Sequence, residues 1–74
     1  MSKGERQRIE KRITQIEVEI AWLESELKML ENALANPPAD GAEVLRLSSA
    51  YSDVQGKLEK LMQAWSIEHE KLED

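Results

Sequence analysis

The sequence lacks cysteine and phenylalanine, and its 74 residues include only three glycines and two prolines. Without cysteine, neither a disulfide nor a thiolate metal site is available to stabilise a core this small. The only aromatic residues are Trp22, Tyr51 and Trp65, which does not favour a globular aromatic core. No apolar run approaches the roughly 18 residues of a membrane-spanning helix. These absences favour long helices that pack Leu and Ile in a cytoplasmic protein, with no membrane partner.

A heptad pattern dominates the sequence on both sides of a single break. In the first half, apolar residues alternate between steps of four and three, at Ile9, Ile13, Ile16, Ile20, Leu23, Leu27, Leu30 and Leu34. The same steps recur in the second half at Val44, Leu47, Tyr51, Val54, Leu58, Leu61, Trp65, Glu68 and Leu72, where Glu68 is the one charged member. We call these positions the seam, because this spacing is typical of helices that pack as a coiled coil.

The break contains two adjacent prolines, Pro37 and Pro38, which cannot continue a helix. Asp40 is a candidate N-cap, and Glu43 is its expected reciprocal partner in a capping box. A connection this short forces the two helices to lie antiparallel. We therefore predict one all-α domain over residues 1–74, a two-helix antiparallel coiled-coil hairpin with helices at about 4–35 and 41–72 and a tip loop at about 36–40. Facing seam residues should have numbers that add to 81.

Positive charge is concentrated at the start of the chain. The net charge is −5, but residues 1–12 carry +3 and the remaining 62 residues carry −8. The candidate nucleic-acid-binding residues, here called the basic end, are Lys3, Arg6, Arg8, Lys11 and Arg12. The antiparallel register places them beside Glu68, Glu70, Glu73 and Asp74, which would neutralise much of the charge. The alternative reading is an ordinary solvated helix face, and the overall charge argues against a general nucleic-acid binder.

A second candidate surface runs along the side of the first helix that faces away from the seam. Its six members are uncharged and spaced three or four apart: Gln15, Val18, Trp22, Ser25, Met29 and Asn32. We call them the docking strip, because a two-helix hairpin has no interior in which to bury Trp22. The strip is expected to bind the rest of a larger protein or a second copy of the chain. The alternative is scattered surface side chains without a role.

No catalytic constellation is present. The chain has no glycine-rich phosphate loop and no Ser/His/Asp set, and we predict that it is not an enzyme and holds no cofactor. His69 is the only histidine, and with Glu68 and Glu70 it makes too weak a ligand set for zinc, because adjacent helical residues point in different directions. No metal site is predicted, and His69 is expected at the surface near Glu10.

The segment "ERQRIEKRITQIEVEIAWLESELKMLENALANP" resembles the first helix of the C-terminal coiled-coil domain of ABC-F ATPases. The matching features are the basic start over Glu5–Arg8, the Ile and Leu pattern from Ile16 to Leu34, and the proline turn at Asn36–Pro37. In the second helix, Leu61, Trp65, Leu72 and Glu73 match the family's closing run. A similar turn occurs in the tRNA-contacting C-terminal arm of valyl-tRNA synthetases, which is generally more basic and lacks the late Trp.

The resemblance implies a non-catalytic accessory domain that belongs to a larger ATPase and follows two ATP-binding cassettes. ATP and Mg²⁺ would be bound by those cassettes and not by this chain. The family acts in translation on ribosomes or, in its Uup-type branch, on nucleic acid, which implies RNA, DNA or ribosome contacts. If the family has a nucleic-acid role here, the basic end is expected to carry it. The alternative class is a structural or dimerisation coil with no nucleic-acid role.

Overall fold

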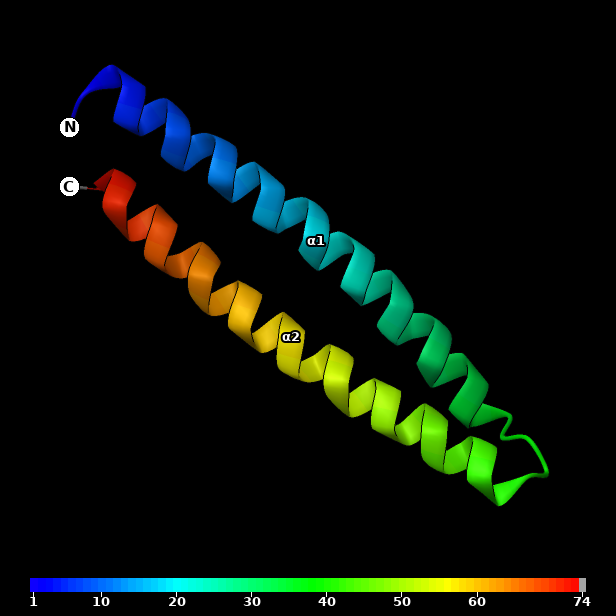
Figure 1. Ribbon diagram of the computed structural model, residues 1–74. Helices are drawn as coiled ribbons and strands as arrows, with labels where there is room; N and C mark the ends of the chain where they lie inside the picture. Colours follow the sequence, from blue (N-terminus) through cyan, green and yellow to red (C-terminus); the bar gives the residue numbers. More distant parts are fainter. Residues whose placement is uncertain (74) are drawn as a thin grey trace.

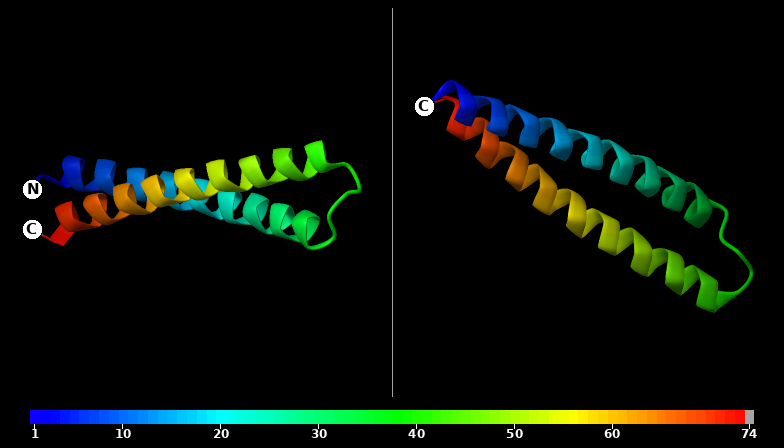
Figure 2. Two further views of the ribbon diagram at one scale, coloured as in Figure 1. Left: turned by 90° about the horizontal axis from the view of Figure 1, so that it is seen from below. Right: turned by 45° about the horizontal axis from the view of Figure 1, so that its top comes forward.

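The computed structural model describes residues 1–73, which form two long helices joined by a short loop (Figure 1). Helix α1 spans Lys3–Ala35 and helix α2 spans Gly41–Glu73. The helices lie side by side and antiparallel, in a rod that measures 57 × 14 × 13 Å. They cross at a shallow angle (Figure 2). The start of α1 and the end of α2 lie at the same end of the rod, which we call the open end, opposite the loop at the tip. The predicted all-α helical hairpin is confirmed.

Helix α1 begins and ends where local hydrogen bonding dictates. The side chain of Ser2 accepts a hydrogen bond from the backbone N–H of Glu5 at 3.2 Å, which satisfies one of the free donors at the helix start. At the other end the backbone N–H of Asn36 still reaches the carbonyl of Asn32 at 3.3 Å. Pro37 has no N–H to donate, so the helix stops before it.

The start of α2 follows the prediction only in part. Asp40 Oδ1 accepts a hydrogen bond from the backbone N–H of Ala42 at 3.0 Å, so Asp40 does cap the helix. The reciprocal half of the capping box was wrong. Glu43 instead binds Arg46 with both carboxylate oxygens. The Arg46 guanidinium, one turn away, donates two charged hydrogen bonds to this carboxylate, and together these are stronger than one bond from a backbone N–H.

The core is a single row of seam residues between the two helices. Every seam position is buried or half-buried, and the most buried apolar residues are Ile9, Ile13, Val54 and Leu58, each 4–8% exposed. The others stay half-buried because each helix has only one neighbour to cover it. The outward sides are so polar that neither helix, within residues 1–73, is apolar enough to cross a membrane.

The hydrogen bonds between the helices report the register. Arg12 Nη1 donates to Glu68 Oε1 at 3.1 Å near the open end, and the Tyr51 hydroxyl donates to Glu31 Oε1 at 3.2 Å near the tip. The residue numbers of these two pairs add to 80 and 82, on either side of the predicted 81. Side chains that flank the seam reach diagonally to their partners, so both pairs agree with the predicted register.

Candidate functional site

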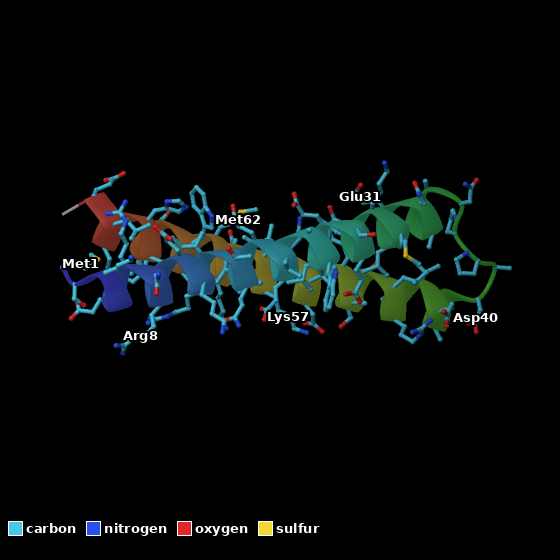
Figure 3. All side chains as sticks on the ribbon, turned by 90° about the horizontal axis from the view of Figure 1, so that it is seen from above. Met1, Arg8, Glu31, Asp40, Lys57 and Met62 are labelled. Atoms are coloured by element: carbon cyan, nitrogen blue, oxygen red, sulfur yellow. The ribbon has the colours of Figure 1, made fainter. Side chains whose placement is uncertain are left out.

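The hairpin has two long flanks where α1 and α2 meet. Figure 3 shows Arg8 and Lys57 at one edge of the rod and Glu31 and Met62 at the opposite edge. We call these edges the Arg8 flank and the Met62 flank. The positions of the basic end and of the docking strip can be described relative to these two flanks, because a partner that binds so thin a rod contacts one side of it.

The five residues of the basic end do not form one cluster. At 3.6 residues per turn, Arg8 and Arg12 are one turn apart and share the Arg8 flank. Arg6 turns the other way, and its Nε donates to Glu10 Oε1 at 3.2 Å. Lys3 and Lys11 are exposed and make no ion pair within residues 1–73. The predicted nucleic-acid surface is therefore reduced to a part of the original set.

A shallow groove on the Arg8 flank gathers the cations that do lie together. It is lined by Glu5, Arg8, Ile9 and Arg12 from α1 and by Lys71 from α2. We call Arg8, Arg12 and Lys71 the basic groove. Lys71 was missing from the sequence prediction, because it lies nearly 60 residues beyond Arg12. The predicted register was the signal that pointed to it, since it sets residue 69, two residues from Lys71, level with Arg12.

Glu68 fixes the position of two of these cations. Its side chain is only 9% exposed, although it carries a charge in the seam. Its Oε1 accepts from Lys71 Nζ at 3.1 Å and from Arg12 Nη1 at 3.1 Å. The hydrogen bond from Lys71, aided by the charge of Arg12, lowers the pKa of Glu68 below its ordinary value. Arg8 makes no ion pair within residues 1–73, so its full charge faces the groove.

Of the acidic residues expected to neutralise the basic end, Glu68 is the one that forms an ion pair with it within residues 1–73. Glu70 and Glu73 line a separate hollow together with Trp65, Ser66 and His69. Neither forms an ion pair with the basic end in the part of the chain that the structure describes. Asp74, the remaining member of the predicted neutralising group, lies outside the described residues.

His69 was expected at the surface near Glu10, but the two side chains form no hydrogen bond or ion pair within residues 1–73. Glu10 binds Arg6, while the ring of His69 lies against Trp65 with centroids 4.2 Å apart. His69 Nε2 is buried and has no hydrogen-bond partner within residues 1–73. Burial of the imidazole against the indole replaces the surface ion pair, because positions four apart on a helix are neighbours. No group of three His, Cys, Asp or Glu side chains with a metal-binding arrangement occurs among residues 1–73.

All six members of the docking strip are exposed. The largest apolar ones are Trp22, 72% exposed, Met29, 70% exposed, and Val18, 45% exposed. Trp22 stands between two hollows. One lies on α1 and is lined by Thr14, Gln15, Val18, Glu19 and Trp22. The other lies between the helices, so Trp22 joins the strip to the interhelical surface.

The hollow between the helices is mainly apolar, and we call it the Trp22 groove. It is lined by Glu19, Trp22, Leu23 and Glu26 from α1 and by Lys57, Lys60 and Leu61 from α2. The sequence analysis assigned Lys60 to no candidate surface and so missed its contribution to this groove. The seam assigned Leu61 to the core, but a core only one row thick leaves it half-buried at the groove wall.

Exposed apolar residues on α2 are scattered. Leu45 is 73% exposed near the tip, whereas Met62 and Ile67 are 47% and 53% exposed toward the open end. Met62 belongs to the Met62 flank, opposite the Trp22 groove (Figure 3). Single exposed apolar side chains are normal for soluble domains, so α2 offers no continuous strip that compares with that of α1.

The length, the turn and the seam of the hairpin can now be compared with known families. The family model of the ABC transporter C-terminal domain matches residues 2–73. The chain belongs to this family. The match is to the C-terminal domain and not to an ATPase domain, so the hairpin is an accessory domain of an ABC protein. It does not support the valyl-tRNA synthetase alternative. No curated protein and no solved structure gave a significant match.

Proposed function

We propose that this ABC transporter C-terminal domain contacts nucleic acid through the basic groove while its docking strip binds a protein surface. The nucleic acid is RNA, including ribosomal RNA, or DNA, and the contacts are to phosphates. ATP and Mg²⁺ are bound, in this proposal, by ATP-binding cassette domains of the same protein, in the cytoplasm. The chain itself carries out no reaction.

The observation that supports this proposal is the cross-helix placement of Arg8, Arg12 and Lys71 along one groove. Arg12 and Lys71 are held by Glu68, so their positions are fixed before a ligand binds. Guanidinium and ammonium groups in a row are suited to successive phosphates of a backbone. No aromatic residue lines this groove, so the proposed contacts are to the backbone and not stacked on bases.

The test is a titration of labelled duplex DNA and of ribosomal RNA fragments with the protein at two salt concentrations, about 50 and about 200 mM. Proteins that contact phosphates lose affinity strongly over this range. Three phosphate contacts predict a slope of about −2.7 in log affinity against log salt, or roughly a 40-fold loss between the two conditions. Arg8→Ala should reduce the slope by about one. If no salt-dependent binding is detected at protein concentrations on the order of tens of micromolar, the nucleic-acid part of the proposal is wrong.

The matched control is Lys28→Ala, which removes the same charge from an exposed position on α1 outside the basic groove. It should leave the slope unchanged. Equal losses for Arg8→Ala and Lys28→Ala would mean that only net charge matters, and the groove would then have no specific role.

A second candidate function, a structural coil without a nucleic-acid role, is favoured by the exposure of Trp22 and the strip around it. Such a coil would act only by docking to the cassette domains or by joining two copies of the protein. Wild-type protein that binds no nucleic acid but loses a protein contact in Trp22→Ala would support this candidate over the first.

A further inference from the structure

We propose that the Trp22 groove binds a second copy of this chain, in a parallel four-helix arrangement with a two-fold axis along the length of the rod. This inference rests on the docking part of the proposed function and names its partner. The axis places α1 of each copy over α2 of the other. Both open ends then lie at the same end of the assembly.

The charges around the groove are self-complementary only in this arrangement. Glu19 and Glu26 lie on the α1 side, and Lys57 and Lys60 lie on the α2 side. None of the four takes part in an ion pair within residues 1–73, although they line the same groove. A two-fold axis along the rod sets the acidic side of one copy against the basic side of the other. An axis across the rod would instead set α1 against α1, with acidic residues facing each other.

The heights of these charges along the rod also agree. In the observed register, Glu26 is level with residue 55 and Glu19 with residue 62. Lys57 and Lys60 are each two residues away from those levels, a distance of about 3 Å along a helix. Lys57 of one copy therefore lies near the level of Glu26 of the other. This is within the reach of long flexible side chains.

The apolar residues complete the interface. Trp22 is level with residue 59, so the indole of one copy lies over Lys60 and Leu61 of the other. Leu23 and Leu61, which are half-buried in the single hairpin, become covered on their remaining side. Burial of Trp22 then takes place in the desolvated centre of a patch, where large aromatic side chains dominate binding energy.

The area required is modest for this molecule. The hairpin exposes 5653 Å², and a standard interface covers about 800 Å² on each partner. That is roughly one seventh of the surface. The same arrangement brings the two basic grooves to one end, where like charges oppose each other. The contacts between the two copies should therefore be closest at the Trp22 groove and weakest at the open end.

The test is a charge-exchange experiment read by sedimentation equilibrium. The first variant is Glu19→Lys with Glu26→Lys, and the second is Lys57→Glu with Lys60→Glu. Each alone sets like charges against each other and should dimerise at least about tenfold more weakly than wild type. An equimolar mixture of the two restores both sets of opposite charges and should form heterodimers. The quadruple variant, whose net charge equals that of wild type, should dimerise like wild type.

Trp22→Ala should abolish the dimer, and Met62→Glu on the opposite flank should not. Circular dichroism at 222 nm establishes that every variant is helical before its mass is measured. The inference is overturned if wild type is monomeric at about 1 mM, a concentration that reveals even weak association. It is also overturned if the mixed variants fail to form heterodimers.

These outcomes can be separated from failure of the proposed function. A monomeric chain whose Trp22→Ala variant binds cassette domains more weakly would exclude the second copy while the docking role stands. The residues exchanged lie outside the basic groove. Trp22→Ala keeps the wild-type net charge and should be monomeric, so its nucleic-acid titration reports on the phosphate contacts of the single hairpin.

Discussion

Replacing Leu58 by Ala should be among the most damaging single truncations of this hairpin. Leu58 is 6% exposed in a core where few side chains reach that burial. The substitution removes three carbon atoms, which corresponds to about 2–3 kcal/mol of lost burial. The cavity term should be small, because a core one row thick opens to solvent and water fills the space. For a domain of this size the loss lowers the melting temperature by about 10–20 °C.

The assay is urea denaturation followed by circular dichroism at 222 nm, at a protein concentration too low for self-association. The matched control is Leu45→Ala, because Leu45 has the same side chain but is 73% exposed on the same helix. It should change the free energy of unfolding by no more than about 0.5 kcal/mol. Equal destabilisation by the two substitutions would refute the assignment of the seam as the source of stability.

Two further predictions concern α2. Gly56 lies inside the helix, and a Cβ added there meets no atom within 4 Å. Gly56→Ala should therefore raise the free energy of unfolding, measured in urea, by about 1 kcal/mol. Gly4→Ala in the first turn of α1 is the control, and a loss of stability in Gly56→Ala would contradict the open surroundings of Gly56. The pKa of Glu68 is lowered from 4.5, so its contribution is complete above that value and is lost as the pH falls through the lower pKa of the folded state. Acid titrations by circular dichroism should show this loss in wild type but not in Glu68→Gln, whose stability at neutral pH should already be lower; identical acid profiles would exclude a role for the ion pairs.

Much of the candidate site was predictable only as a set of residues and not as a surface. The basic end was identified from charge along the sequence, but a helix distributes neighbouring residues around its axis. Arg6 and Arg8 therefore point to opposite sides of α1. Lys71 joins Arg8 and Arg12 only because the chain turns back on itself. The position of His69 was missed because a contact with Trp65 one turn away competes with an ion pair across the helices.

The sequence by itself determined the hairpin, since a heptad pattern, a diproline break and a short loop leave one way to bury the seam. It also determined which side of α1 carries Trp22, because side-chain direction in a helix follows from residue number. Only the tertiary structure decided which α2 residues lie beside that Trp and which cations share a groove. Those neighbours depend on the rotation of one helix against the other, and this rotation is set by packing across the seam.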